Sequence, residues 1–504
     1  MSHPWAPAVL ALYYSVLAVL AFYGVHRLVL VVIFLRTRRR DTPLPEMPAD
    51  PAAWPVVTVQ LPLYNEMYVA ERLIDAVCGL DYPAGRLEIQ VLDDSTDETT
   101  EIVARAVAAH RARGADIHHL HRTDRTGFKA GALAAGLAGA RGELLAIFDA
   151  DFVPAPDFLR RSVPYFADPG IGMVQGSWAH INRGYSLLTR VEAVLLDGHF
   201  LIEHTARNRG GCFFNFNGTA GVWRRRAIET SGGWEHDTLT EDLDLSYRAQ
   251  LGGWRFLYLP ELAVPSELPV DVNGFKSQQH RWAKGAVQTG RKLLGRILRS
   301  PLPLRVKAEA FIHLTNNVSY PLMVVLSVLL FPAMMARRGT SLRMVVMLVD
   351  VPLFLAATVS VLTFYLMSQI ATGEGWRRHV RYLPALMGVG IGLSLNNARA
   401  VLSGLFQRGG TFQRTPKYRI ERRGQSWTAK RYRAGTDPTR AVEAFLSLYF
   451  LGCTVYAWFA GMWTSIPFLL LFVQGYGYMA ALSYLPSVRD WWVRGRRTPI
   501  PETS

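Results

Sequence analysis

The sequence predicts an α/β domain with a mostly parallel, Rossmann-like sheet, inserted between transmembrane helices. Half of the 504 residues are hydrophobic and the mean hydropathy is +0.11, which is unusual for a purely soluble protein. Apolar runs long enough to cross a bilayer lie near both ends of the chain. Between them, from about residue 50 to about 300, short apolar runs alternate with helical patterns, which is typical of crossover units in a parallel sheet.

Residues 1–40 predict an N-terminal transmembrane anchor. Residues 8–35 are almost uncharged and are followed by the basic run RTRRR. The apolar run is too long for the core of a signal peptide, and no small-residue cleavage site follows it, so we expect it to be retained. Because the arginines come after the span, the positive-inside rule places the amino terminus outside and residue 40 onward in the cytosol.

The block of residues 50–300 predicts strands whose carboxyl ends carry acidic residues. The apolar runs VVTVQLPL, LEIQVLDD, DIHHLHR and ELLAIFDAD predict strands, and helical patterns follow the first three of them. Ligands of parallel sheets bind beyond the carboxyl ends of the strands. The residues at those ends are Asn65, Glu66, Asp93, Asp94, Asp149 and Asp151.

The motifs exclude two classes of nucleotide-binding protein and favour a cation site. The first strand-helix turn has no GxGxxG, and the sequence contains no GxxxxGK[ST], which argues against a dinucleotide enzyme and a P-loop motor. Asp149 and Asp151 flank Ala150, so in an extended segment both carboxylates face one hard cation. A solvated turn is the alternative interpretation, and Asp94 on the neighbouring strand end argues against it.

The stretch TLTEDLDLSYRAQLGGW predicts a helix with a free carboxylate on its first turn. Thr238 and Glu241 have the spacing of a capping box, and two glycines close the helix. Glu241 therefore has a structural interpretation at least as good as a catalytic one. Asp242 remains free, and its carboxylate is suited to accept a proton from an attacking hydroxyl.

The stretch SQQHRWAKG places Gln278, Arg281 and Trp282 on one face of a helix. An indole offers a flat platform for a sugar ring, a guanidinium suits a diphosphate, and an amide suits hydroxyl groups. The alternative is an interfacial belt, because tryptophan and arginine both favour the headgroup level of a membrane.

The C-terminal region, residues 301–504, predicts four further spans, and thus about five in the whole chain. Residues 407–440 hold ten basic and two acidic residues, which the positive-inside rule places in the cytosol. The segment 382–405, rich in glycine and asparagine, is therefore expected to form an interfacial or re-entrant helix over about 380–405. Full crossing of this segment is the alternative. The spans are predicted near residues 317–336, 344–370, 441–462 and 465–486.

The charge distribution and the cysteine content give no support for nucleic-acid binding, for a disulfide framework or for a cysteine metal site. The formal charge of +15 falls largely in residues 276–307 and 407–440, beside the bilayer, so no nucleic acid is needed to explain it. The three cysteines lie far apart and form neither a disulfide framework nor a metal-ligand spacing.

A series of motifs in consistent order resembles the processive family 2 glycosyltransferases, in particular cellulose-synthase-like family A, the β-mannan and glucomannan synthases, and more distantly cellulose synthase. The motifs are LPLYNE, IQVLDDSTDET, GFKAGAL, AIFDADFVPAPDFL, FNFNGTAGVW, LTEDLDLSYRAQLGGWRFLYL and QQHRW. The resemblance covers about residues 55–290. It implies a GT-A fold and inverting transfer of a hexose, from GDP-mannose or UDP-glucose, to a growing β-linked polysaccharide that is exported.

The resemblance also implies roles for individual residues. Asp242 is the expected general base, and Asp149 and Asp151 are expected to hold Mg²⁺ or Mn²⁺. The expected donor-binding residues are Asp94, Lys129, Asp149, Asp151, Arg281, Thr415 and Lys417. The expected acceptor-binding residues are Gln278, Trp282, Asn217, Gly218 and Thr219. Phe412, Thr415 and Lys417, within FQRTPK, resemble a gating loop that closes over the nucleotide, and here Arg414 stands where cellulose synthases have Val.

Two rival functions remain at this stage. One is a non-processive transferase that adds a single sugar to a membrane lipid such as ceramide. The other is a transporter without chemistry, against which the intact acidic motifs argue. Polar residues that could line a path for a glycan are Asn316, Asn317, Ser319 and Tyr320, with helix packing as the alternative. We expect a multi-pass protein of the bacterial inner membrane, with the catalytic domain cytosolic and a nucleotide sugar, a glycan and the lipid bilayer as partners.

Overall fold

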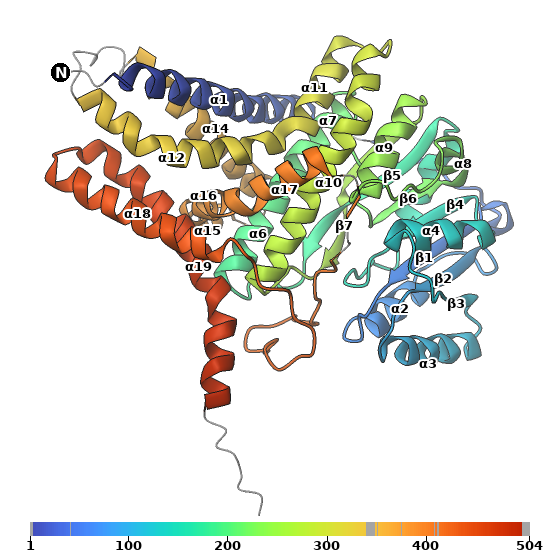
Figure 1. Cartoon of the computed structure of the whole chain (residues 1–504). Helices are drawn as coiled ribbons and strands as arrows, with labels where there is room; N and C mark the ends of the chain where they lie inside the picture. Colours follow the sequence, from blue (N-terminus) through green and yellow to red (C-terminus); the bar gives the residue numbers. More distant parts are fainter. Residues whose placement is uncertain are drawn as a thin grey trace, which may run out of the picture.

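The computed structural model describes residues 4–40, 42–338, 348–349, 351–373, 375–407, 409–410 and 413–495. Figure 1 shows a group of long helices on one side and a domain built around a sheet on the other, with α10 (Val272–Arg299) between them. This arrangement confirms an α/β domain inserted between transmembrane helices.

The sheet has seven strands in the order β3-β2-β1-β4-β6-β5-β7. The strands β1 to β4 are mutually parallel neighbours, as predicted, whereas β6 runs antiparallel to both β4 and β5. β7 is parallel to β5. The bounds are β1 Val57–Leu63, β2 Leu87–Asp93, β3 Ile117–His121, β4 Leu144–Ile147, β5 Ile171–His180, β6 Gly221–Arg224 and β7 Arg255–Ser266.

Helices cover both faces of the sheet. The side chains of successive strand residues point alternately into two hydrophobic cores, one on each face. Leu144 and Ala146 of β4 pack in the core with α2 (Ala70–Cys78), α3 (Thr99–Ala112) and α5 (Phe158–Ser162). Leu145 and Ile147 pack in the opposite core with α4 (Phe128–Gly139), α8 (Arg225–Thr230) and α9 (Glu241–Leu251). Successive side chains of a strand point to opposite faces, which explains the near-continuous apolar character of this strand.

The start of α9 corrects one prediction. The capping-box interpretation of Thr238 and Glu241 is wrong, because the helix begins at Glu241 and its N-cap residue is Thr240, whose side chain makes no capping hydrogen bond. The backbone N–H of Leu239 donates instead to Gln288 Oε1 of α10 at 3.0 Å, which holds this segment outside the helix. The predicted C-terminal stop is confirmed, since Gly252 is the C-cap residue.

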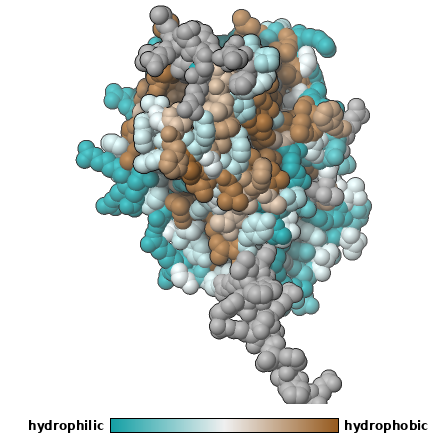
Figure 2. Space-filling view, turned by 60° about the vertical axis from the view of Figure 1, so that its left-hand side comes forward, coloured by the Kyte–Doolittle hydropathy of each residue, from teal (hydrophilic) through white to brown (hydrophobic). Residues whose placement is uncertain are grey.

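Five helices of the described chain are long and apolar enough to cross a membrane, in line with the prediction of about five, and the bent pair Leu383–Gly392 and Ser394–Phe406 would make a sixth if it crossed as one span. They are α1 (Ala6–Thr37), the stretch Leu304–Arg337 made of α11 (Leu304–Thr315) and α12 (Ser319–Arg338), α14 (Val351–Ala371), α18 (Arg440–Phe459) and α19 (Ile466–Gly495). Figure 2 shows hydrophobic residues gathered on the face that these helices form.

The segment 382–405, which was predicted to form an interfacial or re-entrant helix, forms two short helices. α16 (Leu383–Gly392) and α17 (Ser394–Phe406) meet at a bend of 44°. α17 packs against α10 and α12, and α16 packs against α19. The short α15 (Arg377–Val380) precedes them.

Candidate active site

A cavity of about 170 Å³ lies beyond the carboxyl ends of β1, β2 and β4. It is lined by nearly all of the predicted site residues that the structure describes: Asp94, Lys129, Asp149, Asp151, Asn217, Gly218, Asp242, Gln278, Arg281, Trp282, Thr415 and Lys417. Thr219 does not line it, but its hydroxyl accepts a hydrogen bond from the backbone N–H of Asp149 at 2.9 Å. Phe412 lies outside the described residues.

Asp149 and Asp151 follow β4, and each carboxylate is paired with a lysine. Lys129 is hydrogen-bonded to the Asp149 carboxylate, and Lys417 Nζ donates to Asp151 Oδ2 at 2.7 Å. The Asp149 side chain is 32% exposed, toward the cavity that it lines. Mg²⁺ and Mn²⁺ prefer oxygen ligands and, at phosphate-binding sites, commonly take only one or two carboxylates from the protein. The two aspartates therefore fit a divalent ion shared with a diphosphate.

Asp94 does not stand free in the cavity. The guanidinium of Arg122 donates two hydrogen bonds to its carboxylate, at 2.8 and 2.6 Å. Arg122 directly follows β3, so the pair joins the ends of two neighbouring strands. Arg122 was not predicted as a site residue, although its position at the end of the predicted strand DIHHLHR was a usable signal.

Asp242 lies on the first turn of α9, and its environment favours the neutral carboxyl. Burial and, to a lesser extent, the neighbouring Glu241 raise its pKa to about 7, although Lys129 opposes both effects. The backbone N–H of Leu243 donates to Asp242 Oδ1 at 2.8 Å, which fixes the carboxyl group. A general base works best when its pKa lies near the working pH.

Two further carboxyl groups, Glu66 and Glu241, line this cavity without having been assigned a catalytic or binding role from the sequence. Burial raises the pKa of Glu66 to about 7, against the attraction of Arg414, whose guanidinium lies 3.6 Å away. Burial also raises the pKa of Glu241, and Lys129 opposes it. Glu241 lines the cavity because it opens α9 and is not used as a cap.

Gln278, Arg281 and Trp282 face the cavity from α10, which favours the binding-site interpretation over an interfacial belt. The Arg281 guanidinium also donates to the carbonyl of Gln413 at 2.7 Å. This contact ties α10 to the loop that contains Thr415 and Lys417.

The loop of residues 413–433 covers the donor side of the cavity. Lys417 and Thr415 are buried within it. Farther along, the backbone N–H groups of Tyr418 and Arg419 donate to the Glu267 carboxylate at 2.9 and 2.8 Å. The hydroxyl of Tyr432 donates to Asp97 Oδ2 at 2.5 Å. The loop is therefore bound to the catalytic domain at several points, which accounts for its position over the carboxylates.

A second cavity, of about 1250 Å³, extends from Asp242 into the group of long helices. Asp242, Gln278 and Trp282 line both cavities, so the two meet at the face of α10 and the first turn of α9. The polar residues predicted at the entry of the second span also line the large cavity: Asn316, Asn317, Ser319 and Tyr320.

Asn217 is positioned at this junction by two histidines that were not predicted from the sequence. Its side-chain oxygen is hydrogen-bonded to His204 Nε2 at 2.5 Å and its amide nitrogen to His199 Nε2 at 2.9 Å. Both histidines belong to the π-helical stretch Gly198–His204. Irregular helical turns of this kind are frequent at functional sites, but no local sequence pattern indicates them.

Comparisons with known proteins agree with this geometry. The model for "Glycosyltransferase like family 2" matches residues 55–285. Glucomannan 4-beta-mannosyltransferase 7 of Arabidopsis thaliana is 34% identical over 507 residues, which cover 93% of this chain and 87% of that protein. Glucomannan 4-beta-mannosyltransferase 2 of the same plant is 46% identical over 252 residues, which span 49% of this chain and 47% of that protein.

Among solved structures, the fold is similar to that of the mannosyltransferase PcManGT from Pyrobaculum calidifontis in complex with GDP-Man and Mn²⁺. The TM-score is 0.51 at 22% identity, and the match covers 78% of this chain and 99% of that chain. The sheet with its crossover helices is thus a GT-A fold. The chain belongs to glycosyltransferase family 2, as a multi-pass membrane hexosyltransferase of the cellulose-synthase-like A type, the type of the glucomannan 4-beta-mannosyltransferases.

Proposed function

We propose that this protein transfers mannose from GDP-mannose to the end of a growing β-linked mannan or glucomannan, which leaves through the large cavity. The observation that carries this proposal is the position of Asp242, which lines both the donor cavity and the cavity that extends into the membrane helices. A base at this junction can serve an acceptor that arrives from the membrane side and a donor that lies beyond the strand ends. The similarity to glucomannan mannosyltransferases supports mannose as the sugar.

On the donor side, Asp149 and Asp151 would hold Mg²⁺ or Mn²⁺ against the diphosphate. The bound ion would supply positive charge to the leaving diphosphate. Lys417 and Arg281 line the same cavity and stabilise that charge as it develops. Asp94, held by Arg122, and Lys129 contact the nucleotide portion of the donor.

On the acceptor side, Asp242 accepts the proton of the attacking hydroxyl. The hydroxyl oxygen forms a bond to the anomeric carbon while the bond from that carbon to the diphosphate oxygen breaks, and the electron pair leaves with the nucleotide diphosphate. Attack from the face opposite the leaving group converts an α-linked donor into a β-linked product. The indole of Trp282 supports the terminal acceptor ring, and Gln278 and Asn217 bind its hydroxyls.

We also propose that the segment 380–405 does not cross the membrane and that the loop 407–440 lies on the catalytic side. At the end of α14, Gln369 donates to Asp197 of the catalytic domain at 3.0 Å. At the start of α18, Glu443 accepts from Lys276 of α10 at 2.6 Å. Both ends contact the same domain, so the chain between them begins and ends on one side. The positive-inside rule makes that side the cytosol, and we assign the membrane as a bacterial inner membrane. Thr415 and Lys417 would then close over the donor from the cytosolic side.

The proposal is tested by measuring sugar transfer by the purified full-length protein in lipid nanodiscs. Labelled GDP-mannose and UDP-glucose are supplied separately with Mn²⁺ or Mg²⁺, and the products are sized and digested with β-mannanase. We expect a long, mannanase-sensitive polymer from GDP-mannose, and none after the divalent ion is chelated. A single sugar attached to lipid would establish the non-processive alternative, and polymer formed from UDP-glucose alone would overturn the assignment of mannose.

A further inference from the structure

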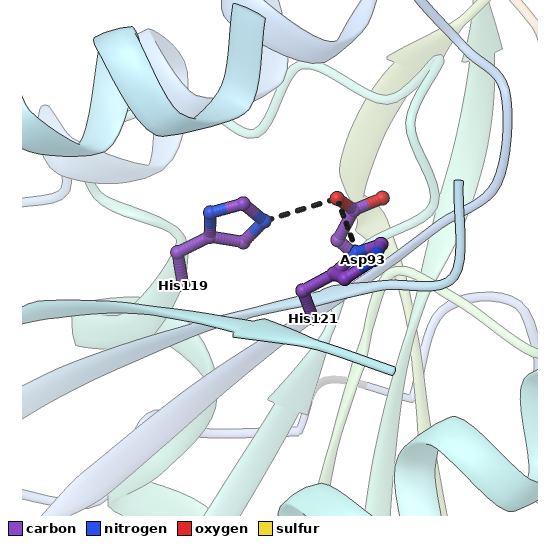
Figure 3. Close-up of side chains that lie close together, drawn as sticks. All are labelled: Asp93, His119 and His121. Carbon is purple, nitrogen blue, oxygen red and sulfur yellow. Dashed lines mark hydrogen bonds and ion pairs between the residues drawn. The ribbon is translucent and has the colours of Figure 1, made fainter. Parts of the chain in front are cut away.

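Two histidines of the edge strand β3 converge on one carboxylate of the neighbouring strand. His119 Nε2 lies 3.0 Å and His121 Nδ1 lies 3.2 Å from the same oxygen, Oδ2 of Asp93 (Figure 3). The two histidines are two residues apart on a strand and therefore share a face of the sheet. The donor site does not use any of these three side chains.

The two distances to Asp93 Oδ2 are close to those between ligand atoms of a tetrahedral metal site. With metal-ligand bonds of about 2.0–2.2 Å, as for zinc bound by histidine and aspartate, neighbouring ligand atoms lie roughly 3.3 Å apart. One ligand atom from each residue can be chosen so that all lie within 4.8 Å of one another. We propose that Asp93, His119 and His121 form a binding site for a transition-metal ion such as Zn²⁺, separate from the divalent ion of the donor.

The surroundings of the three residues favour a bound ion with one open position. Asp93 is fully buried, and its other oxygen, Oδ1, accepts a hydrogen bond from the backbone N–H of Ser95 at 2.9 Å, which fixes the carboxylate. The side chains of His119 and His121 are 17% and 36% exposed, so solvent reaches the site. Two imidazoles select zinc, copper, nickel or cobalt over magnesium, which prefers oxygen ligands.

Among the described residues, a second close group of acidic side chains lacks these features. Glu235, Asp237 and Asp244 surround the ammonium of Lys292, at 2.5, 2.8 and 3.1 Å. A lysine already supplies the positive charge there, so this cluster is an ion-pair network.

A metal at Asp93, His119 and His121 would also act on the donor site. Arg122 follows His121 directly, its backbone N–H donates to the carbonyl of Asp93 at 2.9 Å, and its guanidinium holds Asp94. The ion would lock the ends of β2 and β3 together and so fix the position of Asp94 in the donor cavity.

The test uses the full-length protein, Co²⁺ and Zn²⁺ as probes, and excess Mg²⁺ to occupy the oxygen-ligand site. We expect one Co²⁺ per chain with the visible absorption of a tetrahedral site, displaced by Zn²⁺. His119→Gln and His121→Gln should each weaken binding by about tenfold or more. His118→Gln is the matched control, because His118 directly precedes His119 on β3 but pairs with Asp116, at 2.8 Å. The double variant D149N/D151N should retain the signal.

Equal binding by the wild type and the two glutamine variants would overturn the assignment. X-ray absorption at the zinc edge of the wild-type protein provides a test that needs no variant. Two imidazole nitrogens and a carboxylate oxygen are expected in the first coordination shell. A shell made only of oxygens, or no stoichiometric zinc, would refute the proposal.

Discussion

At the residue scale, Asp242 combines three properties: a helix N-terminal position, a raised pKa and a place on the wall of both cavities. Asp242→Asn keeps the shape but removes the base. We expect transfer to fall by about 10²-fold or more, the usual contribution of a general base, with nucleotide affinity little changed. Steady-state transfer and calorimetric titration with GDP separate the two effects, and transfer at the wild-type rate would contradict the assigned role.

The pKa of Asp242 predicts how the reaction depends on pH. The base must be ionised, and its pKa in the free enzyme is about 7. The value of kcat/KM should therefore rise with pH through about 7 and level off above it, falling about tenfold for each unit below. Glu66 is the control, because its pKa is also about 7. If Glu66→Gln removes the acidic limb, the limb belongs to Glu66.

Gly218 combines a left-handed backbone with a close approach to the reacting groups. Its φ is 79°, and a Cβ there would lie 3.1 Å from Asp242 Oδ2 and 3.3 Å from Lys129 Nζ. Gly218→Ala should cost about 1–2 kcal/mol of stability and about tenfold or more in transfer, because it displaces the base. Gly114→Ala is the matched control, with φ at 93° and open space around the Cβ. Thermal unfolding and transfer assays should show similar destabilisation in both, with loss of transfer only at Gly218.

Residues at this scale were predictable when they lay at the end of a recognisable strand or helix. Asp149, Asp151 and Asp242 satisfy this condition, and the cavity brings them together. Glu66 was named at the end of the first strand but was given no role. His199 was not predicted, because its position depends on contacts between parts of the chain that are distant in sequence. Glu241 was given an alternative role as a cap because helix starts cannot be fixed to one residue from sequence.

At the element scale, α10 connects the catalytic domain to the membrane helices through one buried lysine. Lys276 is 1% exposed, and its ammonium lies 2.8 Å from Asp437 and 2.6 Å from Glu443 and donates to Ser483 at 2.9 Å. Asp437 lies between the loop and α18, Glu443 belongs to α18, and Ser483 belongs to α19. One charge thus joins the helix that carries Trp282 to three other segments.

Lys276→Met should strongly destabilise the protein. It leaves the buried Glu443 carboxylate without its cation, and Asp437 keeps only Arg399, at 3.7 Å. Breaking a buried ion pair in this way typically costs about 3–5 kcal/mol. Ser483→Ala removes only one hydrogen bond from the same cluster and should cost about 1 kcal/mol. The thermal unfolding midpoint in detergent measures both. Equal shifts for the two variants would show that the lysine does not carry the charge balance of the cluster.

The strands β1 to β4 were predictable because apolar runs and crossover helices alternate regularly there. The antiparallel β6 is four residues long and lies between irregular segments, so no periodic pattern marks it. The loop over the donor site was expected only from the resemblance, since its contacts join residues far apart along the chain, such as Lys417 and Asp151.

At the scale of the whole molecule, the large cavity offers a direct test of the glycan path. Gly390 of α16 lines it, and a Cβ at this position would meet open space. Gly390→Phe should fill part of the cavity without disturbing the helix backbone. We expect shorter polymers with the first transfers preserved, measured by gel filtration of labelled product.

The matched control for this variant is Gly452→Phe. Gly452 is exposed on α18 and also has no atom near its Cβ position, so the same side chain is added outside the cavity. Product length should then remain that of the wild type. Polymers of normal length from Gly390→Phe would mean that the glycan leaves by another route.

The shared wall at α10 has a pharmacological consequence. Within the described chain, Lys129, Asp149 and Asp151 line only the smaller cavity, whereas Gln278 and Trp282 line both. A hydrophobic inhibitor lodged among the membrane helices would thus displace the glycan and leave the nucleotide in place. Its inhibition would be competitive with respect to acceptor and noncompetitive with respect to GDP-mannose, so high donor concentrations in the cell would not overcome it.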